Sequence, residues 1–131
     1  MTPSLDRIDH IHVYVTDREI SEQWYLEVLG LSRMPELESW ASGGGPLTVA
    51  NEAGTVHLAL FKRKAQPCRS TIAFGVTALE FVAWRKHLSA TLEEPPKAED
   101  HQLSWSLYFS DPDGNPYEVT TYEYAAFERF V

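Results

Sequence analysis

The first half of the chain has a predicted order of one strand, one helix and three short strands. Residues 8–15 alternate between apolar and polar side chains, as a half-buried strand does. A capping signal at residues 16–19 then begins a helix whose apolar spacing runs over residues 20–29, and Gly30 ends it. Glycine-containing turns separate the next strands, which we expect at residues 37–40, 47–51 and 56–61.

The second half of the chain repeats this order. Residues 71–76 alternate as a strand, a capping box covers residues 77–80, and an amphipathic helix over residues 81–92 is closed by Pro95 and Pro96. Further extended pieces are predicted at residues 92–94, 104–109 and 117–122. A unit used twice predicts an α+β fold of two βαβββ modules, whose curved mixed sheet surrounds a shared cleft.

Length and charge limit the size of the protein and its partners. With 131 residues we expect a single domain, module one over about residues 6–62 and module two over about 69–123. The net charge of −8 disfavours nucleic acids and anionic membranes, because both are themselves negatively charged. The start of the chain has no secretory signal pattern, and a single cysteine, Cys68, allows no internal disulfide. The single cysteine fits the reducing environment of the cytoplasm.

Three histidines fall on strand faces that tolerate polar groups. On the first strand His10, His12 and Tyr14 share one face, whereas Asp9 alternates with them and falls on the apolar face with Ile11, Val13 and Val15. His57 opposes the apolar side chains of the strand at residues 56–61. We therefore expect the three imidazoles on the concave side of the sheet.

A carboxylate is expected on the same kind of face near the C-terminus. Asp111-Pro112-Asp113-Gly114 is a turn sequence, and the strand that follows directs Glu118 away from its apolar side. Two imidazoles and one carboxylate are the donor set of catalytic zinc and non-haem iron sites. The candidate ligands are His10, His57 and Glu118, with His12 as a substitute. Taken singly, each of these side chains is more often a packing or surface residue than a ligand.

Three segments together resemble the vicinal oxygen chelate superfamily, which contains glyoxalases, bleomycin resistance proteins and extradiol dioxygenases. They are residues 8–17, 24–31 and 108–118. The resemblance implies paired βαβββ modules that supply metal ligands from their first and last strands. His10 matches the first ligand position and Glu118 the last, while His57 matches a variable one. Thr71 stands where metal-using relatives usually have histidine, so His57 or a water held by Thr71 would complete the set.

The resemblance also implies the kind of function. We expect a metal-dependent enzyme, a lyase or an extradiol-type dioxygenase, that chelates neighbouring oxygens of a small substrate with Fe, Zn, Ni or Mn. Glu118 would be catalytic as well as a ligand, and relatives imply a homodimer. The alternative is a metal-free protein that binds a drug or a flat hydrophobic ligand, as bleomycin resistance proteins do. Candidate substrate-binding residues are Tyr14, Trp40, Phe61, Thr71, Tyr108 and Tyr122.

A glycine run lies beside these residues. Gly43-Gly44-Gly45 is not followed by the Lys-Ser or Lys-Thr of a phosphate-binding loop. We expect a mobile hairpin loop there that could close over the cleft as a lid.

Overall fold

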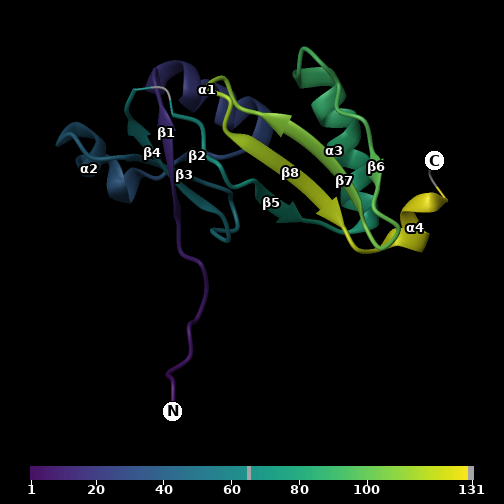
Figure 1. Cartoon of the computed structure of the whole chain (residues 1–131). Helices are drawn as coiled ribbons and strands as arrows, with labels where there is room; N and C mark the ends of the chain where they lie inside the picture. Colours follow the sequence, from purple (N-terminus) through teal and green to yellow (C-terminus); the bar gives the residue numbers. More distant parts are fainter. Residues whose placement is uncertain (65, 130–131) are drawn as a thin grey trace. The chain divides into compact units, whose positions relative to one another are not determined.

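Two four-stranded mixed sheets, each with its own helices, make up the fold (Figure 1). The computed structural model describes residues 1–64 and 66–129. The chain divides into two units, Met1–Gln66 and Pro67–Val131. Each unit follows the predicted βαβββ order, so the α+β class and its two modules are confirmed. Within the described part of the chain, no helix has the length and apolar character needed to cross a membrane.

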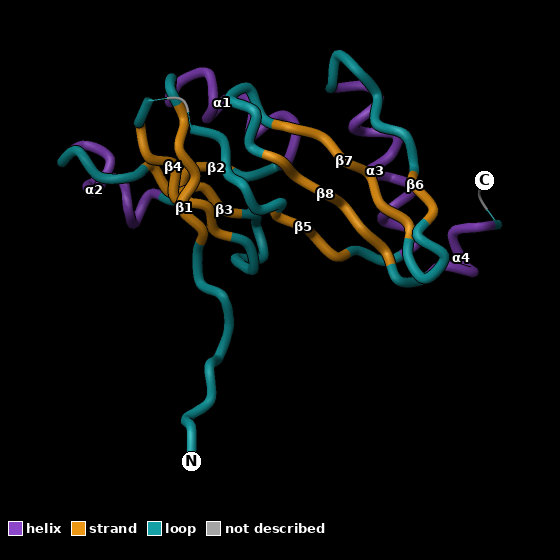
Figure 2. Tube along the Cα trace, viewed as in Figure 1, coloured by secondary structure: helices purple, strands orange, loops and turns teal. Residues whose placement is uncertain are grey.

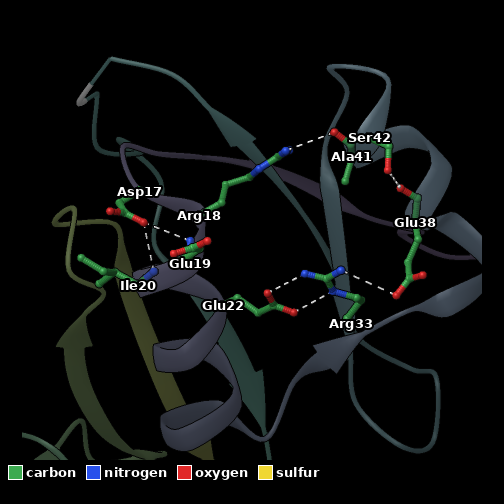
Figure 3. Close-up of polar contacts among 9 residues, drawn as sticks. All are labelled: Asp17, Arg18, Glu19, Ile20, Glu22, Arg33, Glu38, Ala41 and Ser42. Carbon is green, nitrogen blue, oxygen red and sulfur yellow. Dashed lines mark hydrogen bonds and ion pairs between the residues drawn. The ribbon is translucent and has the colours of Figure 1, made fainter.

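The first unit contains a sheet with the strand order β1-β4-β3-β2. Strand β1 runs parallel to β4, while β3 is antiparallel to both of its neighbours. The strands are β1 (Ile11–Val15), β2 (Ser32–Arg33), β3 (Leu47–Ala50) and β4 (His57–Lys62). Helix α1 (Arg18–Leu29) connects β1 to β2. The Asp17 side chain caps this helix by accepting hydrogen bonds from the backbone amides of Glu19 and Ile20 (Figure 3).

The predicted apolar face of β1 forms the core of the first unit. Val13 and Val15 are fully buried, as are Tyr25 of α1 and Leu60 of β4. Gly30 ends α1 in the left-handed conformation, with φ of 69°, where a side chain would be strained. Burying side chains of this size contributes roughly 1.5–3 kcal/mol each, which holds β1 and β4 firmly in register.

The second unit has the matching strand order β5-β8-β7-β6. Its strands are β5 (Ile72–Gly75), β6 (Glu99–Asp100), β7 (Trp105–Ser110) and β8 (Pro116–Thr121). Helix α3 (Ala78–Thr91) begins with the predicted capping box, in which Thr77 and Glu80 exchange hydrogen bonds. A short helix, α4 (Tyr124–Glu128), follows β8, and its Phe127 packs edge-on against Phe81 of α3.

The predicted turn before β8 is confirmed and is densely hydrogen-bonded. Asp111 accepts hydrogen bonds from the backbone amides of Asp113 and Asn115, at 2.9 and 2.8 Å, and from the Asn115 side-chain amide at 2.8 Å. The side-chain oxygen Oδ1 of Asn115 accepts in turn from the Cys68 backbone amide at 2.8 Å. Gly114 adopts φ of 84°. This turn sets the start of β8 and thereby the position of Glu118.

Two predicted strands are wrong. Residues 37–40 belong to a 3₁₀ turn, η1 (Pro35–Leu37), and to helix α2 (Glu38–Ser42), coloured as helix in Figure 2. Pro35 occupies the first position of η1, where its preset φ favours a helical turn and its missing amide proton is not needed. Trp40 therefore lies on a helix. Residues 92–94 are not a strand either; β6 forms at Glu99–Asp100, beyond Pro95 and Pro96.

The first strand is also shorter than predicted. Strand β1 begins at Ile11, and the residues before it form a loop (Figure 2). The alternation expected over residues 8–10 therefore does not apply, and Asp9 does not face the core. All residues from 1 to 10 are exposed.

Candidate functional site

The parallel pairing of β1 with β4 gathers histidines at one end of the first sheet. Ile11 pairs with Leu58 and His12 with Ala59, so the start of β1 lies beside His57, the first residue of β4. The Nδ1 atom of His57 is 3.1 Å from the backbone carbonyl oxygen of Asp9. His57 therefore lies next to the loop that carries His10, although the two residues are 47 positions apart in sequence.

The hydrogen bonds at Nδ1 of His10 and His57 determine which nitrogen of each ring is available to bind a metal ion. A backbone carbonyl only accepts, so the His57 Nδ1 carries the proton that it donates to Asp9. The His10 Nδ1 lies 2.8 Å from the Asp9 carboxylate, and this hydrogen bond lowers the pKa of Asp9 below its ordinary value. An ionised carboxylate also only accepts, so in the neutral form of each ring the unprotonated nitrogen is Nε2. Histidines that bind metals are commonly oriented in this way by a carboxylate or a carbonyl.

The Nε2 atoms of His10 and His12 face each other. They are 3.2 Å apart, whereas the ring centroids are 5.1 Å apart and the ring planes differ by 22°. The two rings thus approach each other most closely at their Nε2 atoms and lie farther apart at their centres. Two imidazole ligands of one tetrahedral ion, each at 2.0–2.1 Å, stand about 3.3 Å apart. The pair fits the spacing of metal ligands, and it equally fits a hydrogen bond donated by His12 to His10.

These imidazoles line a pocket of about 220 Å³ in the first unit. Polar groups come from β1, β3, β4 and the loop before β1, and apolar side chains come from the segment between β2 and β3. The lining residues are Asp9, His10, His12, Met34, Leu37, Trp40, Pro46, Thr48, His57 and Ala59. Trp40, predicted as a cleft wall, contributes to this pocket. Tyr14 and Phe61 do not line it; they pack edge-to-face on each other, and Phe61 also contacts the His12 ring.

In the second unit Glu118 lies in the middle of β8. It pairs with Ala73 of β5 on one side and with Tyr108 of β7 on the other. The buried Ser106 hydroxyl donates a hydrogen bond to its carboxylate at 2.6 Å. The carboxylate is half-buried and is held in one orientation by Ser106.

The other predicted residues of the second unit lie at different distances from Glu118 along the sheet. Thr71 is exposed and precedes β5, and Tyr122 is exposed just after β8. Tyr108 is the direct cross-strand neighbour of Glu118. Burial raises the pKa of the Tyr108 phenol above its ordinary value, and the negative charge of Glu118 raises it further.

His101, an exposed residue just after β6, lies against Tyr108. Its Nε2 is 2.9 Å from the Tyr108 hydroxyl. Gln102, with φ of 70°, makes the tight turn that returns the chain from His101 to Ser104. A non-glycine residue with positive φ cannot be read from composition, so the sequence held no clear signal for this contact.

In the part of the chain that the structure describes, no three side chains of His, Cys, Asp or Glu are gathered into a group suited to a metal ion. Of the predicted ligands, the structure brings His10 and its substitute His12 together in the first unit. The full set of His10, His57 and Glu118 stays a prediction.

Comparison with known proteins identifies the family. The sequence model of the glyoxalase/bleomycin resistance protein/dioxygenase superfamily matches residues 7–119. The chain belongs to this superfamily. The match contains both strands that carry the histidines and reaches past Glu118. Enzymes and small-molecule binding proteins both occur in the superfamily. A comparison with the curated proteins finds no match.

Solved structures share the fold of this superfamily member. A Bacillus anthracis protein assigned to the glyoxalase family is 22% identical with a TM-score of 0.70, covering 93% of this chain and 99% of its own. An integron cassette protein from the Halifax Harbour sewage outfall metagenome is 25% identical with a TM-score of 0.67, covering 89% and 99%. The fosfomycin resistance protein FosX of Listeria monocytogenes is 15% identical with a TM-score of 0.66, covering 88% and 90%. That FosX structure, of a mutant, contains Mn(II) and dihydroxypropylphosphonic acid.

Proposed function

We propose that this superfamily member is a metal-dependent enzyme that acts on a small molecule with two neighbouring oxygens. The observation that carries the proposal is the paired Nε2 atoms of His10 and His12, 3.2 Å apart, with Asp9 holding the far side of the His10 ring. The proposed ion is Fe, Zn, Ni or Mn, because imidazole ligands suit the first three metals and a carboxylate ligand suits Mn. The presence of Mn(II) in the FosX relative supports a divalent ion.

The proposed ligands are His10 with His12 or His57 from module one, and Glu118 from module two. Bound there, a divalent ion would stabilise negative charge that develops on substrate oxygens. Asp9 orients His10, and the carbonyl of Asp9 orients His57. Ser106 keeps the Glu118 carboxylate from rotating. A carboxylate and neutral imidazoles are ligand types that leave open positions for a substrate in catalytic sites.

Tyr108 is the proposed proton-holding group beside Glu118. Because its pKa is raised, its phenol stays protonated throughout the neutral range. Its hydroxyl is within hydrogen-bond distance of His101 Nε2, which can accept the phenol proton or return it. In this proposal Tyr108 positions a substrate oxygen next to the Glu118 face of the second sheet.

Metal content is the first test of the proposal. The protein is purified without chelator, and its metals are measured by mass spectrometry in the wild type and in His10→Ala, Glu118→Gln and His87→Gln. We expect about one ion per chain in the wild type and its loss in His10→Ala and Glu118→Gln. His87→Gln should keep the ion, because His87 lies on helix α3 and is not a proposed ligand. A protein that takes up no ion after reconstitution with Fe(II), Mn(II), Ni(II) and Zn(II) would refute the proposal.

The reaction type is tested separately. Iron-loaded protein is assayed with catechols for oxygen uptake, and nickel- or zinc-loaded protein with hemithioacetals for isomerisation. Oxygen uptake that needs Glu118 would assign a dioxygenase, whereas isomerisation would assign a glyoxalase-type lyase. Sedimentation of the purified protein tests the homodimer that family resemblance implies.

A metal-free binding protein is the second candidate. Thr71 favours it, because threonine is a poor ligand at a position where metal-using relatives usually have histidine. This candidate predicts ligand binding that is unchanged by chelator and by Glu118→Gln.

A further inference from the structure

The apolar side of the first-unit pocket comes from one short segment. Met34, Leu37, Trp40 and Pro46 all lie between β2 and β3, in the stretch formed by η1, α2 and the glycine run. We call residues 34–46 the pocket wall. It faces the imidazoles and the Thr48 hydroxyl, which lie on or beside the sheet. The pocket therefore has one apolar side and one polar side.

Arg33 holds the beginning of the pocket wall. Its guanidinium donates two hydrogen bonds of 2.8 Å to the Glu22 carboxylate of α1, and it lies 3.7 Å from the Glu38 carboxylate of α2 (Figure 3). Arg33 lowers the pKa of Glu22, and Glu22 raises the pKa of Arg33. The two-pronged contact ties the pocket wall to α1.

Arg18 holds the end of the pocket wall. From the first position of α1 it donates to the carbonyl oxygens of Gly45, at 2.7 Å, and Ala41, at 3.2 Å (Figure 3 shows the contact with Ala41). Gly45 also donates from its backbone amide to the Trp40 carbonyl at 2.7 Å. A Cβ at Gly45 would lie 2.9 Å from that oxygen, so the close approach requires glycine. The glycine run is thus the tightly bonded end of α2 and not a hairpin between strands.

No lysine or arginine lines the pocket, whose residues all lie in the described part of the chain. Arg18 and Arg33 are occupied at their guanidinium groups by α1, α2 and the glycine run, and Arg7 is paired with the carboxylates of Asp6 and Asp9. The lining side chains thus offer no fixed cation to a phosphate or phosphonate, and only the proposed metal ion would supply one. It offers apolar surface, one indole and one thioether, which favour an aromatic ring.

We propose that the pocket wall, held by Arg18 and Arg33, selects a ligand with a single aromatic ring and an oxygen substituent. The ring contacts Trp40 and Met34, and the oxygen faces the histidines. An engineered cavity of about 150 Å³ takes a benzene molecule, so a pocket of about 220 Å³ has room for one substituted ring and not for a large fused system. The inference deepens the proposed function by naming its substrate class, but contact with the ring needs no metal ion.

The test uses the full-length protein in chelator, so that no metal contributes. Calorimetric titrations with 4-ethylphenol, cyclohexanol and 2-naphthol compare an aromatic ring, a saturated ring and a fused ring. We expect 4-ethylphenol to bind at least fivefold more tightly than the other two. Trp40→Ala should weaken its binding about tenfold, since an aromatic contact and the buried ring area are lost together. Trp84→Phe, which changes a tryptophan on α3, should have no effect.

A second variant tests the role of the arginine. Arg18→Ala removes both hydrogen bonds to the pocket wall and should weaken 4-ethylphenol binding severalfold, whereas Lys86→Ala on α3, the matched loss of a helix cation, should not. Trp40 is 54% exposed, so its replacement leaves the core intact, and circular dichroism verifies this. Equal binding of 4-ethylphenol by wild type and Trp40→Ala, or of 4-ethylphenol and cyclohexanol by wild type, would overturn the inference. Metal binding without selectivity for 4-ethylphenol would refute this inference but not the proposed metal-dependent enzyme. Selective binding of 4-ethylphenol without any metal uptake would refute the enzyme but not the role of the pocket wall.

Discussion

Replacing His12 separates the two interpretations of the His10–His12 contact. If both Nε2 atoms bind one ion, His12→Ala removes a ligand. If His12 only donates a hydrogen bond to His10, the variant removes a neighbour and leaves the His10 Nε2 free to bind. The distance of 3.2 Å is compatible with both arrangements, so affinity must decide between them.

The size of the expected loss follows from typical ligand energies. Structural zinc sites with four ligands bind with about 10–16 kcal/mol, which is about 3 kcal/mol for each ligand. A loss of that size corresponds to an increase of about 150-fold in the dissociation constant. Removing an orienting partner instead of a ligand typically costs about 10–100-fold. The same titration of Asp9→Asn should therefore show a smaller loss than His12→Ala.

The assay is a competition titration of metal-free protein with Zn(II), using a chromophoric chelator of known affinity. Wild type, His12→Ala, His10→Ala and His101→Gln are compared at one pH. His101→Gln is the matched control, because it removes an exposed histidine that is hydrogen-bonded to a tyrosine in the second unit. A zinc affinity of His12→Ala within threefold of wild type, with His10→Ala strongly weakened, would refute the ligand role of His12.

Three further predictions concern the framework around the site. Asp111→Ala should lower the free energy of unfolding of the second unit by about 3 kcal/mol, measured with urea, because it leaves two backbone amides and a side-chain amide without their acceptor. Gly45→Ala should reduce 4-ethylphenol binding by displacing Trp40, whereas an unchanged affinity would contradict the close approach. The hydrogen bond to Asp100 raises the pKa of Tyr124 to about 12. Its stabilising contribution is full below about pH 10 and lost as the pH rises through about 12; tyrosinate absorbance should show this titration returning toward 10 in Asp100→Asn.

The local rules of helix capping predicted the framework well. Asp17 and Thr77 mark the starts of α1 and α3, because their side chains accept hydrogen bonds from backbone amides that have no partner within the helix. Fully buried Val13 and Val15 likewise follow from alternation along β1. These features depend on neighbours in sequence, which is why the sequence alone was sufficient for them.

The parts that sequence did not predict depend on contacts between distant residues. Residues 37–40 were predicted as a strand although only Leu37 and Trp40 are apolar among them, and so short a segment does not distinguish a strand from a helix. Asp9 was assigned to the apolar face by extending an alternation that stops at Ile11. Its partnership with His57 arises from the parallel register of β1 with β4 and has no local signal.

The two modules share a topology but differ in what they place on matching strands. The face of β1 that carries His12 and Tyr14 corresponds in β5 to Ala73 and Gly75, which have no side-chain donors. The proposed nitrogen ligands and the pocket wall thus belong to module one, while the proposed carboxylate ligand, Glu118 with its hydrogen bond from Ser106, belongs to module two. This division predicts separable defects. Variants of the pocket wall should change which ligand binds without altering metal affinity, and Glu118→Gln should alter metal affinity while leaving phenol binding in chelator unchanged.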